Sequence, residues 1–192
     1  MSFQYPVVLR VTGRRCLVIG EGDEAEEKAR GLEKAGAEVV RRGAGCAGDL
    51  EGFFLVVAAT RDVVLNARIA AEARQRGVLC NAVDDPKNCD FILPAIHRQG
   101  DLTVSVSTNG KSPVVAVKLR DRLAAEIGPE YGRLLYLMGE LRPEVAERIP
   151  DFDKRRELWR RLADSGALDL LRAGLEAEAR RRIRELLERH AA

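Results

Sequence analysis

The sequence predicts an α/β protein in which a shortened parallel sheet is followed by an all-helical portion. Short apolar runs alternate with helical patterns over residues 1–110, as they do in chains of β–α–β units. One of these runs breaks into a glycine turn that leads directly into a helix, within Cys16–Arg30. After Gly110 the pattern is helical to the end of the sequence.

The composition is that of a soluble globular protein. The 192 residues are enough for one medium domain or two small ones, and 46% are hydrophobic and 32% charged. No apolar stretch approaches the length of a membrane span, and residues 1–14 lack the apolar core of a signal peptide. We therefore expect a cytoplasmic protein without a membrane partner. The small net charge of +2 argues against a nucleic-acid partner.

Few residues are available for metal or histidine chemistry. The four cysteines have no metal-ligand spacing, and the chain holds only two histidines, His97 and His190. We expect no metal site, so carboxylates or a cofactor must carry any reaction.

The first strand, expected at Cys16–Ile19, leads into a turn that indicates dinucleotide binding. The turn reads Gly20-Glu21-Gly22-Asp23-Glu24-Ala25. The first glycine allows the sharp turn, the second lets the backbone approach a pyrophosphate, and the small Ala25 lets the helix pack on the strand. A plain tight turn is the alternative. The acidic side chains favour the positive helix end, but they would also compete with a pyrophosphate for it.

The other elements follow from apolar periodicity and from stop signals. Strands are expected at Ala37–Val40, Phe54–Ala59, Val78–Val83 and Leu102–Ser107. The first helix ends at Gly36, and a second spans Leu65–Arg76 and stops at Gly77. Ser112 and Pro113 start a helix, and helices are expected over Val114–Ile127, Glu130–Ile149, Asp153–Ala163 and Ala167–Arg189.

The connection after the second strand is unusually short. Only the ten residues Gly43–Gly52 join Arg42 to Phe53, and they can reach at most about 33–36 Å. That length allows a bare crossover loop but no additional helix and strand, so we expect the usual third strand to be missing. The second strand also ends in Arg41-Arg42 instead of the acid that holds an adenosine ribose. These arginines either favour a 2′-phosphate or are simply exposed.

Two polar segments follow later strands. Asp84 comes directly after the strand Val78–Val83, at the sheet edge where such folds bind ligands, and is the best-placed general base. The alternative is that Asp84 and Asp85 only satisfy backbone amides in an Asp-Pro turn. The loop Ser107–Pro113 offers hydroxyls, backbone N–H groups and one cation, which suit an anionic ligand; capping of the next helix by Ser112 is the structural alternative.

Taken together, the sequence resembles the precorrin-2 dehydrogenase family, the N-terminal module of siroheme synthase. The matching segments are listed in chain order: Tyr5-Pro6-Val7; Gly13 to Gly20; Gly22-Asp23 with Ala25-Glu26 and Lys28-Ala29-Arg30; Val57 to Thr60 with Asn66; Asn81 to Asp84; Asp90-Phe91-Ile92; and Ser107 to Pro113. They cover most of residues 5–145. The Asn-x-x-Asp and Ser-Thr-x-Gly-x-Ser-Pro segments are more specific than the glycine turn.

The resemblance implies a homodimer made of a Rossmann-like domain (1–112), a dimerisation region (113–149) and a helical C-terminal domain (150–192). It implies oxidation of the tetrapyrrole precorrin-2 to sirohydrochlorin with NAD⁺, with NADP⁺ left open, and in some members insertion of Fe²⁺. By position, Asp84 matches the catalytic carboxylate. The cofactor site would comprise Gly20, Gly22, Asp23, Glu24, Ala25, Gly43, Ala44 and Thr60, and the substrate site Asn81, Ser107, Thr108, Asn109, Gly110 and Lys111.

The sequence departs from the family pattern on the dinucleotide side. Glu21 stands where the family usually has glycine, Glu24 where it has an aliphatic residue, and the crossover Gly43–Gly52 is short. These departures predict weakened NAD⁺ binding with a retained tetrapyrrole site. Two alternatives to the dehydrogenase follow: a sirohydrochlorin ferrochelatase that needs no nucleotide, and a non-catalytic tetrapyrrole-binding protein.

Overall fold

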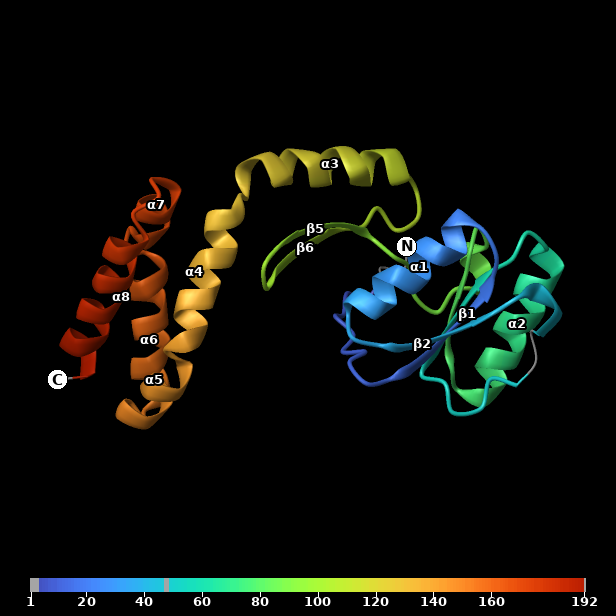
Figure 1. Ribbon diagram of the computed structural model, residues 1–192, viewed down its shortest axis with the longest axis horizontal. Helices are drawn as coiled ribbons and strands as arrows, with labels where there is room; N and C mark the ends of the chain where they lie inside the picture. The colour runs from blue at the N-terminus through green and yellow to red at the C-terminus, as the bar shows by residue number, and fades with distance from the viewer. Residues whose placement is uncertain (1–3, 47–48, 192) are drawn as a thin grey trace. The chain divides into compact units, whose positions relative to one another are not determined.

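The computed structural model describes residues 4–46 and 49–191 and forms two compact units, Met1–Leu93 and Pro94–Ala192 (Figure 1). The division lies before the hairpin that contains residues 102–106, so this hairpin belongs to the second unit. The three functional domains expected from the sequence, 1–112, 113–149 and 150–192, stay a prediction.

The first unit is built on a four-stranded parallel sheet with the order β2-β1-β3-β4. Its strands are β1 (Arg15–Gly20), β2 (Glu38–Arg42), β3 (Leu55–Ala59) and β4 (Leu79–Ala82). In the described part of the connection between β2 and β3, the only regular element is the 3₁₀ turn η1 (Ala44–Cys46). The expected fold is confirmed: β2 lies at the edge of the sheet, and the described residues form no further strand beyond it.

Helices cover both faces of this sheet. In β1 the side chains alternate: Leu17 and Ile19 pack in the core beneath α2 (Val63–Arg76), while Cys16 and Val18 pack beneath α1 (Asp23–Lys34). This period-two alternation is what a strand buried on both faces requires. The two helices lie on opposite sides of the sheet in Figure 1. The layered arrangement places the carboxyl ends of all four strands at one edge.

The second unit begins with an antiparallel hairpin, β5 (Ala95–Gln99) and β6 (Leu102–Val106). The sequence predicted the second of these strands as a member of the β–α–β series, and that placement is wrong. The first strand was missed because its residues are only half-buried and show no apolar alternation. Helix α3 (Pro113–Glu126) packs on the hairpin, where His97 Nε2 lies 2.8 Å from the carbonyl oxygen of Ile127.

The remaining helices form a bundle with its own core. They are α4 (Pro129–Glu140), α5 (Arg142–Arg148), α6 (Phe152–Ala163), α7 (Ala167–Arg172) and α8 (Glu176–Ala191). Leu158, Leu162 and Leu187 are fully buried among them. Two helices expected as continuous are broken. Pro143 lies in the first turn of α5 and cannot continue α4, and Gly174 adopts a φ of +75° after α7.

Candidate functional site

The end of β1 forms the glycine corner that the sequence predicts. Gly20 has a φ of +141°, and a Cβ there would lie 2.1 Å from the carbonyl oxygen of Ala59. Only glycine therefore allows the ends of β1 and β3 to approach this closely. Gly22 has a φ of +92°, and a Cβ on it would meet no atom within 4 Å. The second glycine thus leaves open space for a ligand next to the backbone, while Ala25 is buried against the sheet.

A cavity of about 300 Å³ lies at this corner, between the end of β1, the first turn of α1 and the side chain of Arg41. Gly22 precedes α1, and no side chain caps the first amides of the helix. These free N–H groups and the positive end of the helix dipole suit the pyrophosphate of a dinucleotide. Three acids, Asp23, Glu24 and Glu26, lie in the same turn, and Glu24 Oε1 is 3.9 Å from Lys28 Nζ. The residues present fit a dinucleotide.

The two arginines at the end of β2 have partners within the protein. Arg41 donates to Glu33 at 2.7 Å and to Glu26 at 3.4 Å, so it ties β2 to α1. The hydrogen bond from Arg41 lowers the pKa of Glu33. Arg42 donates to the carbonyl oxygen of Asp49 at 2.9 Å and lies over the ring of Phe53. Both side chains therefore have partners within the protein, although Arg41 remains exposed.

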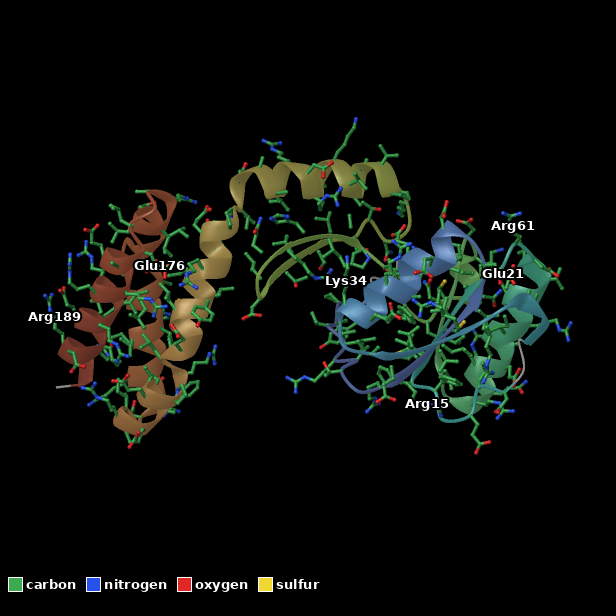
Figure 2. The ribbon with its side chains drawn as sticks, viewed as in Figure 1. Arg15, Glu21, Lys34, Arg61, Glu176 and Arg189 are labelled. Atoms are coloured by element: carbon green, nitrogen blue, oxygen red, sulfur yellow. The ribbon has the colours of Figure 1, made fainter. Side chains whose placement is uncertain are left out.

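The next two residues, Gly43 and Ala44, follow β2 directly. The carboxylate of Glu21 lies against Gly43: a Cβ on that glycine would be 2.9 Å from Glu21 Oε1. Glu21 thus reaches from the glycine turn to the end of the neighbouring strand, a contact that the sequence did not reveal. Figure 2 shows Glu21 and Arg61 at one end of the first unit and Arg15 at the other.

Thr60, which follows β3, is held in place by a buried amide. Asn66 is only 1% exposed and makes three hydrogen bonds to Thr60: Oδ1 accepts from the backbone N at 3.2 Å and from Oγ1 at 2.6 Å, and Nδ2 donates to the carbonyl oxygen at 3.0 Å. Asp62 caps α2 by accepting from the amides of Val64 and Leu65. The sequence analysis did not identify Asn66 or Asp62 as positioning residues. Asp62 could have been found, because an Asp directly before an apolar helical run is a signal for a helix N-cap.

The segment after β4 folds back along the open edge of that strand. Asp90 both donates its backbone N–H to the carbonyl oxygen of Cys80 and accepts from the N–H of Cys80. Asn81, which the sequence placed in the substrate site, is 8% exposed and donates to the carbonyl oxygen of Phe91 at 2.9 Å. Burial, with the charge of Asp90 nearby, raises the pKa of Cys80 to about 12. These contacts cover an edge that would otherwise pair with another strand.

Asp84 differs from the other carboxylates of this segment. Asp85 accepts from Asn88 at 2.7 Å and Asp90 accepts from Cys80, but the exposed carboxylate of Asp84 has no hydrogen bond or ion pair within residues 4–46 and 49–191. Its backbone has a φ of +58°, a conformation that costs a non-glycine residue about 1 kcal/mol or more. The turn therefore holds a free carboxylate in a strained position at the carboxyl edge of the sheet.

The loop after β6 is tightly organised. The hydroxyl of Thr108 donates to the carbonyl oxygen of Ser112 and accepts from its N–H, and Ser112 Oγ accepts from the amide of Val115. The helix-capping alternative for Ser112 therefore holds. Asn109 and Gly110 have φ values of +58° and +76°, and Ser107 Oγ accepts from the amide of Asn109. Lys111 is exposed. This part of the predicted substrate site lies in the second unit.

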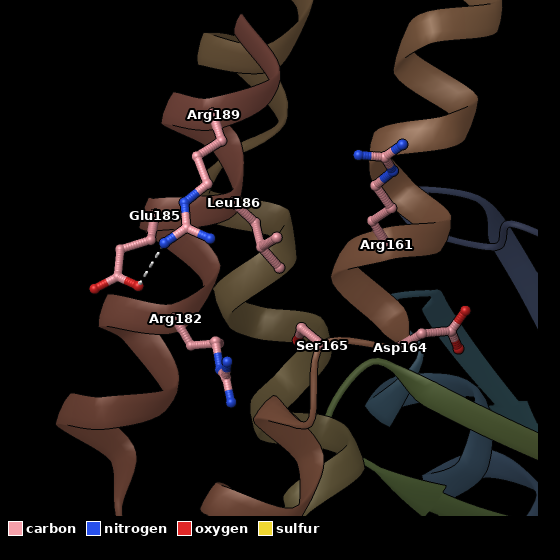
Figure 3. A pocket seen from close by; sticks show the side chains of 7 residues that line it. All are labelled: Arg161, Asp164, Ser165, Arg182, Glu185, Leu186 and Arg189. Atoms are coloured by element: carbon pink, nitrogen blue, oxygen red, sulfur yellow. Dashed lines mark ion pairs between the residues drawn. The ribbon is translucent and has the colours of Figure 1, made fainter.

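The helical bundle contains a second cavity, of about 380 Å³, whose lining includes none of the cofactor-site or substrate-site residues that the resemblance implies (Figure 3). Arg161, Arg182 and Arg189 line it together with Asp164 and Glu185. Arg161 is paired with Glu157, and Arg189 lies 4.0 Å from Glu185. Charges of both signs surround the cavity. No group of three or more metal-ligating side chains occurs in the described residues, and none of the helices described there is long and apolar enough to cross a membrane.

Comparisons with known proteins agree with this architecture. Three family models match successive parts of the chain: a putative NAD(P)-binding family at residues 7–41 and 40–95, the sirohaem biosynthesis protein central family at 99–126, and the sirohaem synthase dimerisation region at 130–187. The siroheme synthase of Azotobacter vinelandii is 38% identical over 92% of this chain and 42% of that protein. The siroheme synthase of Photobacterium profundum is 34% identical over 95% of this chain and 44% of that protein.

The chain thus spans less than half the length of these curated relatives. Among solved structures, SirC, a precorrin-2 dehydrogenase, matches with a TM-score of 0.74 over 95% of this chain and all of that one, at 21% identity. This likeness shows that the two proteins share a fold.

Proposed function

The chain belongs to the siroheme synthase family, and from this premise we propose that it is an NAD-dependent precorrin-2 dehydrogenase. Conversion of precorrin-2 to sirohydrochlorin removes a hydride and a proton from the tetrapyrrole. The protein must therefore hold a hydride acceptor and a base beside one substrate.

The observation that carries the proposal is the position of Asp84 relative to the glycine corner. In the sheet register Gly20 lies opposite Ala59, and Ala58 lies opposite Ala82. The glycine turn, Thr60 and the turn that contains Asp84 therefore leave the sheet at the same edge, where parallel α/β sheets bind their ligands. A cavity suited to a dinucleotide and the carboxylate of Asp84, which has no partner among the described residues, share this edge.

Each part of the edge has a role in the proposed reaction. The amides of the first turn of α1 would bind the pyrophosphate, and the bound nicotinamide would supply the hydride acceptor. Asp84 would accept the proton, because its carboxylate is exposed and engaged with no other described side chain. Apart from this edge, the loop Ser107–Lys111 of the second unit has backbone amides and a cation, Lys111, that would suit carboxylate groups of the substrate.

We also propose that the protein acts as a homodimer. Its residues 130–187 match a dimerisation region. In addition, α3 exposes the apolar side chains of Val114, Val117 and Leu119, which are 65%, 41% and 45% exposed. Apolar side chains gathered on one exposed helix are typical of a surface that another chain covers. Sedimentation of the purified protein tests this: a monomer at micromolar concentration would contradict it.

An anaerobic assay that follows NADH formation from precorrin-2 tests the dehydrogenase. Asp84→Asn keeps the size and the tolerance for positive φ but removes the base, so kcat should fall by a factor of about 10²–10⁴. Asp85→Asn is the matched control, because it changes the adjacent carboxylate and should leave kcat largely unaltered. Full turnover by Asp84→Asn would remove Asp84 from the proposed role.

The same preparation separates the dehydrogenase from the alternatives. Sirohydrochlorin and Fe²⁺ supplied without nucleotide would yield siroheme only if the chain also inserts iron. Binding of the tetrapyrrole without NADH formation would instead support a non-catalytic carrier and would contradict the proposal.

A further inference from the structure

Glu21, the residue between the two glycines of the turn, reaches an unexpected place. From the sequence alone, its negative charge is expected to repel the pyrophosphate of the cofactor. In the structure, however, its Oε1 atom lies 2.9 Å from the point that a Cβ of Gly43 would occupy, so the carboxylate is seated against the backbone that follows β2. Glu21 also lines the cavity at the glycine corner.

The end of the second strand is where dinucleotide-binding sheets hold the adenosine ribose. In that fold an acidic side chain from this position accepts hydrogen bonds from the ribose hydroxyls. Here β2 ends in two arginines and is followed by Gly43 and Ala44, so the carboxyl end of β2 provides no acid. The carboxylate of Glu21, reaching across from β1, stands at that place instead.

We propose that Glu21 is the ribose-binding acid of this protein and the residue that selects NAD⁺ over NADP⁺. This inference rests on the proposed function, because it assigns a residue to the cofactor site of that reaction. Within residues 4–46 and 49–191 the carboxylate of Glu21 has no hydrogen bond and no ion pair. Both of its oxygens can therefore accept from the ribose hydroxyls.

The surrounding charges favour a ribose that carries no 2′-phosphate. Such a phosphate has a charge of about −1.5 to −2 and would be repelled by Glu21. Arg41, the cation that lines the same cavity, donates to Glu33 and Glu26, and those two carboxylates offset its charge. Arg42 donates to the carbonyl oxygen of Asp49 and lies over Phe53. The 2′-phosphate of NADP⁺ would therefore lie beside the carboxylate of Glu21. The charge of Arg41 is already offset by Glu33 and Glu26 and would not compensate for this repulsion.

Gly43 offers an independent way to move the carboxylate. Its backbone does not have a positive φ, so alanine is tolerated there, but the new Cβ would contact Glu21 Oε1 too closely and displace the flexible side chain. Gly45 is the matched control: its φ is likewise not positive, and a Cβ on it would meet no atom within 4 Å. Gly43→Ala should therefore disturb the site while Gly45→Ala should not.

Calorimetric titration of the full chain with NAD⁺ and NADP⁺ tests the inference without relying on turnover. Losing charge-assisted hydrogen bonds to the ribose should weaken NAD⁺ binding by about tenfold or more in Glu21→Gln. NADP⁺ binding should stay the same or improve, so that the preference for NAD⁺ shrinks. Gly43→Ala should shift the affinity for each nucleotide in the direction in which Glu21→Gln shifts it. Gly45→Ala should bind both nucleotides like the unmodified protein. Far-UV circular dichroism verifies that each variant is folded.

Two results would overturn the inference. If Glu21→Gln or Glu21→Gly binds NAD⁺ more tightly, the carboxylate obstructs the cofactor, as the sequence alone suggested. If their affinities are unchanged, Glu21 does not contact the ribose.

ADP-ribose, which lacks the nicotinamide, separates this inference from the proposed function. A protein that binds ADP-ribose through Glu21 but does not oxidise precorrin-2 would contradict the dehydrogenase and leave the role of Glu21 intact. If the unmodified protein binds neither ADP-ribose nor NAD⁺, the cofactor site is refuted and Glu21 has no such role.

Discussion

Replacing Asn66 by alanine should cost the first unit much of its stability. The side chain is 1% exposed and makes three hydrogen bonds to Thr60, two through Oδ1 and one through Nδ2. A buried hydrogen bond contributes about 0.5–1.5 kcal/mol net, so the three together are worth about 1.5–4.5 kcal/mol. The loss leaves the backbone N–H and carbonyl oxygen of Thr60 without these partners.

Asn88→Ala provides the matched control. Asn88 is half-buried and its amide makes one hydrogen bond, to Asp85 Oδ2 at 2.7 Å. The same substitution there should cost about 1 kcal/mol or less. Because Asn66 fixes the peptide at the end of β3, Asn66→Ala should also weaken NAD⁺ binding, whereas Asn88→Ala should not.

Urea unfolding with two optical probes measures both effects. The only tryptophan, Trp159, lies in the helical bundle and reports the second unit, while far-UV circular dichroism reports both units. Asn66→Ala should lower the midpoint of the dichroism transition and leave the tryptophan transition in place. The reasoning is refuted if Asn66→Ala destabilises the protein no more than Asn88→Ala.

Three further predictions concern other parts of the chain. Leu158→Ala empties a fully buried position in the helical bundle and should lower the free energy of unfolding by about 2–5 kcal/mol, measured by Trp159 fluorescence in urea. Cys80 should resist iodoacetamide at pH 8 in the folded protein and react in urea, as peptide mapping would show, because burial raises its pKa to about 12. Hydrogen bonds from Arg148 and Arg184 lower the pKa of Glu144 below its usual 4.5 in the folded state. The stabilisation is therefore present above about pH 4.5 and is lost as the pH falls through the folded value. The urea midpoint of the bundle should drop on acidification, less steeply in Glu144→Gln; equal slopes would contradict this.

The glycine corner illustrates what local sequence can predict. The strand, turn and helix of Arg15–Lys34 are consecutive in the chain, and their apolar spacing and glycines specify them without reference to distant residues. The shortened sheet was also predictable, because the reach of the connection Gly43–Gly52 is a matter of covalent geometry.

The errors have equally physical causes. Pro143 and Gly174 are themselves signals that a helix ends, but apolar periodicity continues across both positions. In each case two separate helices were therefore predicted as one. The strand that contains Leu102 was assigned to the parallel sheet because a single strand carries no information about its partner. Its neighbour β5 was missed, since a half-buried edge strand lacks the alternation that identifies a strand.

The sequence by itself determined the kind of fold, the glycine corner and the candidate carboxylate Asp84, because each depends on a few adjacent residues. Only the tertiary structure decided which polar groups are engaged and which are available. Asn81 and Asp90 hydrogen-bond along the edge of β4, and Arg41 donates to Glu33 of α1. The carboxylate of Glu21 lies against Gly43 at the end of β2. Hydrogen bonds and ion pairs join residues far apart in the chain, so their partners follow from how strands and helices pack and not from spacing along the sequence.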